Sequence, residues 1–114
     1  MNISEFKVKP KLIEIVLDDK SIIDAYKEEI TFYMYDHIAI PKYFDFFKAQ
    51  SEGNTNKLLE LMRELILDVN GKAVMDNDHT LPIDIFTACV LKVTDHLGKS
   101  VTKHSTQTET GTQQ

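Results

Sequence analysis

A chain of 114 residues is long enough for one domain and short for two. Hydrophobic residues make up 42% of it and charged residues 27%, ordinary values that argue against disorder over most of the chain. The formal net charge of −5 argues against a nucleic-acid partner, because affinity for phosphates depends on clustered lysine and arginine. We also expect no membrane partner and a cytoplasmic protein, because no apolar run approaches roughly 20 residues and the N-terminus does not read as a secretory signal.

The start of the chain is predicted to be extended. Phe6 and Val8 alternate with lysines, and the run from Lys11 to Leu17 is rich in the β-branched residues that favour strands. Pro10 cannot donate a hydrogen bond to a sheet, so it belongs at a strand edge or between two strands. We therefore predict a short N-terminal β element of about two strands. An exposed edge of the strand 11–17 could pair with a second copy, which makes a homo-oligomer possible.

The region 22–47 is expected to organise the fold, because eight of the ten aromatic residues lie between Tyr26 and Phe47. A stripe at helical spacing predicts an amphipathic helix that Ser21 caps and that stops or bends before Pro41. The stripe consists of Ile22, Tyr26, Ile30 and Tyr33.

After the proline, the apolar run from Tyr43 to Phe47 predicts a short second helix, which the punctuation Ser51-Glu52-Gly53-Asn54 closes. Two interpretations of the aromatic rings remain open. They build the core, as aromatic residues at helical spacing usually do, or some of them stay exposed and hold another protein. In the second interpretation the partner-binding residues are Tyr35, Tyr43, Phe44 and Phe47.

Two more helices follow. One runs from about Thr55 to Val69, with Asn54 or Asn56 as its cap and Asn70-Gly71 at its end. Asp76-Asn77-Asp78 then predicts a turn, in the one later place where short strand structure could recur. The last helix opens at Leu81-Pro82 and ends at Gly98, and its buried stripe is predicted to consist of Ile85, Phe86, Cys89, Val90, Val93 and Leu97.

These elements predict a mostly α fold of the α+β class. Residues 1–98 form a small helical domain with a short N-terminal β element, and residues 99–114 form a disordered polar tail that cannot repay the entropy of ordering.

Motifs of enzymatic chemistry are scarce. The sequence has no glycine-rich phosphate loop, no nucleophile elbow and no Cys-x-x-Cys pair. Cys89 is expected to be a buried structural thiol, and Asp76-Asn77-Asp78 lacks the glycine and glutamate of a calcium loop. The histidines are scattered and expected at the surface: His37, His79, His96 and His104. We therefore expect a non-enzyme without a metal or cofactor.

The C-terminal half carries short motifs in a set order, namely Gly71-Lys72-x-Val74, Asp78-x-x-Leu81-Pro82-Ile83-Asp84-Ile85, Thr87-Ala88 and Leu97-Gly98-Lys99-Ser100. In type and order they resemble the C-terminal half of the small tail assembly chaperones of long-tailed bacteriophages. The wider plan is similar over residues 6–100: an extended start with lysines and proline, a central helical region and a helix led by Leu-Pro.

The resemblance implies an assembly factor that binds the tape measure protein, keeps it soluble and recruits tail tube protein. Such a factor acts in the host cytoplasm and is absent from the mature virion. An apolar groove lined by the aromatic segment would suit the long amphipathic helices of a tape measure. Two alternatives remain: a structural tail or baseplate subunit of the virion, or a small regulatory protein, which a deep polar pocket around Asp76, Asp78 and His79 would favour.

Overall fold

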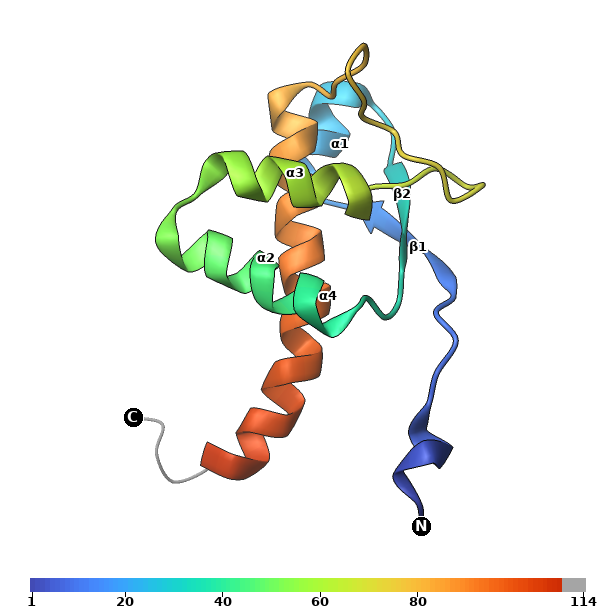
Figure 1. Ribbon diagram of the computed structural model, residues 1–114. Helices are drawn as coiled ribbons and strands as arrows, with labels where there is room; N and C mark the ends of the chain where they lie inside the picture. Colours follow the sequence, from blue (N-terminus) through green and yellow to red (C-terminus); the bar gives the residue numbers. More distant parts are fainter. Residues whose placement is uncertain (110–114) are drawn as a thin grey trace.

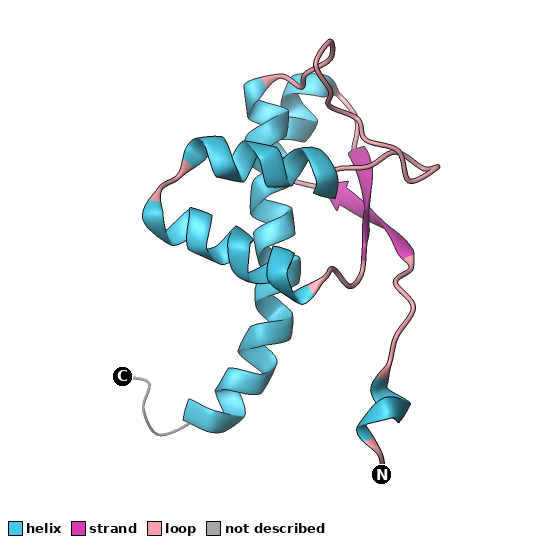
Figure 2. Ribbon diagram, viewed as in Figure 1, coloured by secondary structure: helices cyan, strands magenta, loops and turns pink. Residues whose placement is uncertain are grey.

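The computed structural model describes the backbone of residues 1–109 and the side chains of residues 1–98. The first strand of the fold lies where the sequence predicts one. Strand β1 (Leu12–Leu17) pairs antiparallel with β2 (Ile30–Tyr35), from Leu12 opposite Tyr35 to Leu17 opposite Ile30. Within the described residues this two-stranded sheet is accompanied by four α-helices (Figure 1, Figure 2). The predicted α+β class, mostly α with a short β element, is confirmed.

The predicted long helix from Ile22 onward is wrong in its second half. Helix α1 (Lys20–Tyr26) follows Asp19 rather than Ser21, and Lys27 ends it in the left-handed conformation, with φ 68°. The chain then enters β2, where Phe32 and Met34 point into the core and their neighbours in the strand are more exposed. This alternation is that of a strand, and pairing with β1 decides it over the helical spacing.

The N-terminal residues do not form the predicted extended alternation of Phe6 and Val8. A 3₁₀-helix (Ile3–Phe6) forms there instead, because the Asn2 side chain accepts a hydrogen bond from the Ser4 N–H and the Glu5 carboxylate accepts one from the Asn2 N–H. Residues 1–11, here called the N-terminal arm, are exposed throughout and lead away from the helices (Figure 1).

Helices α2 (Ile40–Glu52) and α3 (Thr55–Leu65) form an antiparallel hairpin, as the punctuation predicts (Figure 1). Pro41 lies in the first turn of α2, Gly53 ends that helix with φ 67°, and the Asn54 side chain caps α3 by accepting a hydrogen bond from the Lys57 N–H at 3.1 Å. The predicted second and third helices are therefore confirmed at these ends.

Helix α3 ends at Leu65 and not at the predicted Val69. Ile66 is extended, and Leu67 forms single bridges with Tyr33 of β2 and with Ala73. The sequence predicts that short strand structure could recur near residue 71, and among the described residues the structure has only these two isolated bridges there. Gly71, with φ 81°, lies in the turn that joins them and does not end a helix.

Helix α4 (Ile83–Glu109) begins directly after Leu81-Pro82, with Asp84 in its first turn as predicted. The predicted end at Gly98 is wrong: the helical backbone continues to Glu109, since a glycine inside a helix weakens it by about 1 kcal/mol and does not stop it. The disorder predicted for residues 99–114 stays a prediction, because the side chains from residue 99 onward and the whole of residues 110–114 lie outside the described part.

The core lies where the sheet, the helical hairpin and α4 meet. Five of its side chains, one each from β1, β2, α2, α3 and α4, are at most 1% exposed: Leu17, Met34, Phe46, Met62 and Val93. Polar links tie α4 to the rest, since Lys92 donates to Asp18 at 2.7 Å and Gln50 donates to Thr94 at 2.7 Å. Of the predicted stripe of α4, Ile85, Cys89, Val93 and Leu97 are buried, while Phe86 and Val90 are half-buried against the core.

Candidate functional site

Three of the four residues predicted to bind a partner lie on α2, and two of these serve the fold. The Tyr43 hydroxyl donates to the Leu97 carbonyl of α4 at 2.8 Å. The Phe47 ring packs edge-on against Phe46, with centroids 5.3 Å apart, and lies 5.2 Å from the Tyr43 ring. Both side chains are half-buried against the core, so their visible role is to hold α2 against α4.

Phe44 is the outermost ring of this group. It is 67% exposed and meets Tyr43 at 6.1 Å with the ring planes 70° apart. One turn earlier on the same face, Ile40 is 69% exposed. Ile40 and Phe44 thus form a short exposed apolar stripe, here called the α2 stripe. A large apolar side chain that its own fold leaves in water is available to a partner.

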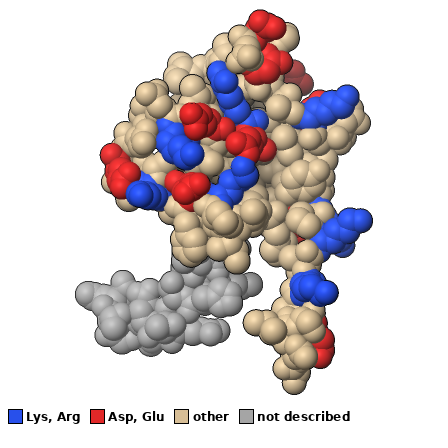
Figure 3. Space-filling model, in the orientation of Figure 1, with Lys and Arg blue, Asp and Glu red and all other residues tan. Residues whose placement is uncertain are grey.

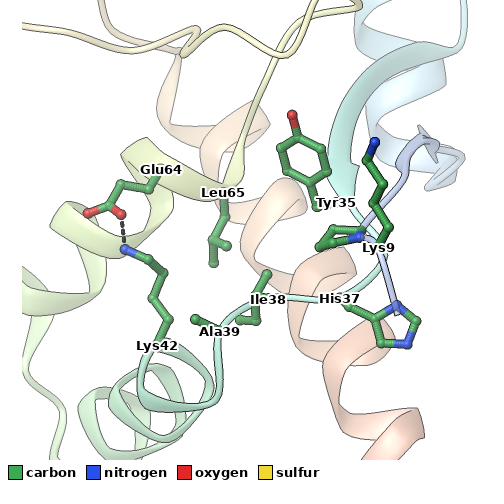
Figure 4. A pocket seen from close by; sticks show the side chains of 9 residues that line it. Lys9, Tyr35, His37, Ile38, Ala39, Lys42, Glu64 and Leu65 are labelled. Carbon is green, nitrogen blue, oxygen red and sulfur yellow. Dashed lines mark hydrogen bonds and ion pairs between the residues drawn. The ribbon is translucent and has the colours of Figure 1, made fainter. Parts of the chain in front are cut away.

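Tyr35, the fourth predicted residue, lies apart from the other three and lines a pocket (Figure 4). The pocket has a volume of about 380 Å³ and is open to the surface, and most of its wall is apolar. The apolar wall consists of Pro10, Tyr35, Ile38, Ala39 and Leu65, and the charged or polar residues at its edge are Lys9, His37, Lys42 and Glu64. We call it the Tyr35 pocket.

Four segments build this pocket, and hydrogen bonds fix where they meet. At the end of the sheet the Lys11 N–H donates to the Asp36 carboxylate at 2.8 Å, and the Asp36 N–H donates to the Lys11 carbonyl at 2.9 Å. This reciprocal pair sets the root of the N-terminal arm beside the segment that leads into α2. An ion pair between Lys42 of α2 and Glu64 of α3 closes the opposite edge (Figure 4).

Tyr35 is held on its outer side by the turn after α3. A Cβ atom placed on Gly71 would lie 3.3 Å from the Tyr35 hydroxyl oxygen, so the absence of a side chain at Gly71 lets the ring stand where it does. Tyr35 remains 40% exposed, which leaves its other side to the pocket.

Charged groups lie at and beside the pocket edge, and one of them is the carboxylate of Asp36, next to Tyr35 and His37 in the chain. The hydrogen bond from the Lys11 N–H holds the pKa of Asp36 below its usual range, with a smaller contribution in the same direction from His37, whose Nδ1 lies 3.2 Å from the carboxylate. Asp36 is therefore ionised at neutral pH. Lys9 places a positive charge near the opening, while the charges of Lys42 and Glu64 are paired with each other. The pocket therefore suits an apolar group with an acidic neighbour that Lys9 can reach.

The sequence predicted only Tyr35 among the residues of this pocket. The signal that could have pointed to the rest is the apolar run Ile38-Ala39-Ile40 before Pro41, which is too apolar for a solvated linker.

Helical geometry separates the pocket from the α2 stripe. Lys42 and Phe44 are two positions apart, which is about 200° around a helix, so the four predicted residues do not form one surface.

The other candidate chemistry lies on the surface or is buried. Asp76, Asp78 and His79 are all exposed in a turn, where the Asp76 carboxylate accepts hydrogen bonds from the N–H groups of Asp78 and His79 at 2.8 Å; the predicted turn is confirmed, and it forms no deep polar pocket. Cys89 is buried as predicted, and burial raises the pKa of its thiol to about 12.

The histidines differ in exposure. His37 and His79 are exposed as predicted, His96 is half-buried with Nε2 3.4 Å from the Asp36 carbonyl, and the His104 side chain lies outside the described residues. Across the part of the chain with described side chains, no three His, Cys, Asp or Glu residues gather as ligands of a metal ion would. None of the described helices is long and apolar enough to cross a membrane.

In comparisons with protein-family models, with curated proteins and with solved structures, no match to this chain was found. The features of this chain that bear on its function are therefore the Tyr35 pocket, the α2 stripe and the motifs of the sequence.

Proposed function

We propose that this chain is a phage tail assembly chaperone, a non-enzymatic protein that binds the tape measure protein and promotes assembly of the tail tube around it. The proposal combines two supports. One is the resemblance of the motifs between Gly71 and Ser100 to that family. The other, which carries the physical argument, is the Tyr35 pocket: an open apolar recess that the fold itself leaves unfilled.

The pocket has the properties needed to hold an amphipathic helix. Such a helix presents large apolar side chains at i, i+3, i+4 and i+7, and a groove-binding protein receives one or more of them in a recess. A volume of about 380 Å³ lies within the range of about 300–1,000 Å³ that is usual for ligand sites. Leu65 and Ile38 give the recess an apolar floor and wall, and Tyr35 adds an aromatic edge.

Charge at the pocket edge favours a client of a particular kind. Lys9 lies at the opening with its positive charge available, whereas the charges of Lys42 and Glu64 are paired with each other. A client helix with an acidic residue beside its apolar anchor would therefore be preferred. A single pocket of this size binds weakly. Many copies along one long client would hold it by avidity, and each could be released when tail tube protein arrives.

This function places the chain in the host cytoplasm during assembly and leaves it out of the mature virion. Mass spectrometry of purified particles tests that part: an assembly factor should be missing from them. Its presence in stoichiometric amounts would instead indicate the alternative, a structural tail or baseplate subunit.

The binding step is tested by filling the pocket. Ala39 lines it, is exposed and makes no side-chain capping bond, so Ala39→Phe should occupy the recess with little cost to the fold. The matched control is Ala25→Phe, the same change at an exposed position of α1 outside the pocket. Each variant is co-expressed with a candidate tape measure protein that is insoluble alone, and the soluble fraction of the client is measured.

We expect the unchanged chain and Ala25→Phe to keep the client soluble, and Ala39→Phe to lose most of this effect while its circular dichroism stays that of the unchanged chain. If Ala39→Phe keeps the client soluble, the Tyr35 pocket is not the binding site. If the unchanged chain solubilises no such client, the chaperone function itself is wrong.

A further inference from the structure

The N-terminal arm carries apolar side chains that its own body does not use. Ile3, Phe6 and Val8 are 83%, 65% and 59% exposed, and no residue of the 3₁₀-helix is buried. The arm nevertheless has local order, since the reciprocal Asn2 and Glu5 bonds cap that helix. Ordered backbone with exposed large apolar side chains is a costly arrangement for an isolated monomer, and it is typical of a segment that docks elsewhere.

A second unfilled surface lies at the other end of the molecule. A groove of about 310 Å³ runs between the start of α1 and the outer face of α4. Its apolar lining includes Ile83 and Leu91, two turns of α4 apart and 77% and 60% exposed. Among the residues with described side chains, the charged ones that line it are both acidic, Asp19 and Asp84. We call it the α1/α4 groove.

The charges of the arm and of this groove are opposite. The arm carries Lys7, Lys9 and Lys11 against one glutamate, in a chain whose formal net charge is −5. Lysine side chains can be followed along the arm in Figure 3. Phe6 ends the 3₁₀-helix and Val8 follows it, with Lys7 between them, so the arm can place Phe6 and Val8 in an apolar groove while Lys7 reaches an acidic edge.

The arm of a chain points away from the α1/α4 groove of the same chain. The arm leaves β1 at Leu12, whereas α1 follows the other end of that strand, after Leu17. A strand of 6 residues separates the two by about 20 Å, and Figure 1 shows the arm on the far side of the body from α1 and the first turns of α4. A second copy can supply its arm to this groove without that reversal.

We propose that two copies of this chain exchange N-terminal arms, with Phe6 and Val8 of each copy in the α1/α4 groove of the other and Lys7 beside Asp19 and Asp84. The exchange is two-fold symmetric, so each copy contributes one arm and one groove. The α1/α4 groove shares no residue with the Tyr35 pocket, although Lys9 and Pro10 at the root of the arm line that pocket. The proposal stands whether or not the chain is a chaperone.

The test is sedimentation equilibrium of the full chain with variants of each half of the contact. Phe6→Ser alters the arm and Leu91→Glu alters the groove, both at exposed positions. Val69→Ser, at a side chain 62% exposed outside both surfaces, is the control. We expect a dimer for the unchanged chain and for Val69→Ser. Each of the other two should raise the dimer Kd at least tenfold, because a buried Phe or Leu contributes well over one such factor.

A mixing experiment distinguishes exchange between copies from an arm that folds back on its own body. Phe6→Ser keeps its groove and Leu91→Glu keeps its arm, so an equimolar mixture should form heterodimers through one intact contact, at a concentration where neither variant dimerises alone. Formation of heterodimers in the mixture would support the proposal. A mixture that stays monomeric, a monomeric unchanged chain, or a Phe6→Ser variant that dimerises like the unchanged chain would each overturn it.

Discussion

The aromatic residues of α2 show how differently neighbouring residues of one type are used. Phe46 is fully buried, Phe47 is half-buried between Phe46 and Tyr43, and Phe44 projects into solvent. Helical geometry separates them, because each step along the chain turns the side chain by about 100°. The sequence pattern therefore marked α2 as important without distinguishing the ring that builds the core from the ring that a partner can reach.

Substitution of Phe44 tests this distinction. Phe44→Ser should change the free energy of unfolding by no more than about 0.5 kcal/mol, since the ring is largely exposed, whereas Phe46→Ala should lower it by about 3–5 kcal/mol through the cavity it leaves. Urea denaturation followed by circular dichroism measures both. If the α2 stripe contacts a client, Phe44→Ser should also solubilise less of it. A loss of several kcal/mol in Phe44→Ser would mean that the ring belongs to the core.

At the scale of secondary-structure elements, local signals predicted both ends of α2 and the start of α3, whereas the ends predicted at Asn70-Gly71 and Gly98 are wrong and the second strand was not predicted where it lies. Pro41, Gly53 and Asn54 act within one turn of themselves, and the structure places α2 and α3 where they indicate. Strand β2 was missed because its residues also fit the helical stripe that begins at Ile22. What decides between the two is pairing with β1, a contact between residues far apart in sequence that no local spacing contains.

Two glycines in left-handed conformation give a matched pair of element-scale variants. Gly53 and Gly71 have φ values of 67° and 81°, so alanine at either should cost about 1–2 kcal/mol of unfolding free energy. They differ in their surroundings. A Cβ atom at Gly53 would meet nothing within 4 Å, but at Gly71 it would press on the Tyr35 hydroxyl at 3.3 Å.

Gly71→Ala should therefore weaken client capture beyond Gly53→Ala, because it displaces the ring that lines the Tyr35 pocket. The soluble fraction of the co-expressed client, compared at equal amounts of folded variant, measures the difference. Equal capture by the two variants would show that the position of Tyr35 does not matter for binding.

At the scale of the whole molecule, the Tyr35 pocket could not have been predicted from the chain. Its wall joins Pro10, Tyr35, Ala39 and Leu65, which come from the arm, the sheet, the start of α2 and the end of α3. Periodicity predicts which face of one element is apolar, but not which faces of four elements leave a space between them. Tyr35 was selected for its residue type, and its role in the pocket follows only from the assembled fold.

The whole molecule is also held together by carboxylates whose pKa values the fold lowers, which makes its stability depend on pH. Hydrogen bonds lower the pKa of Asp36 (from the Lys11 N–H), of Asp18 (from Lys92) and of Asp68 (from the Lys72 N–H). A carboxylate with a lowered pKa stabilises the folded state above its unfolded value of about 3.9, and this contribution is lost as the pH falls through the folded pKa. Stability should be nearly constant from neutral pH to about 5 and should decline below about 4.

Asp36 joins the arm, the sheet and the pocket edge, so it is the most informative of these groups. Asp36→Asn keeps an oxygen that can accept the hydrogen bond from the Lys11 N–H but removes the titrating charge. It should be less stable than the unchanged chain at pH 7, and the difference should be smaller at pH 3, because the contribution of a carboxylate with a lowered pKa begins to be lost below its unfolded value of about 3.9. Urea denaturation at the two pH values measures both free energies of unfolding. A difference that is the same at pH 7 and pH 3 would show that Asp36 stabilises the fold by its shape and not by its charge.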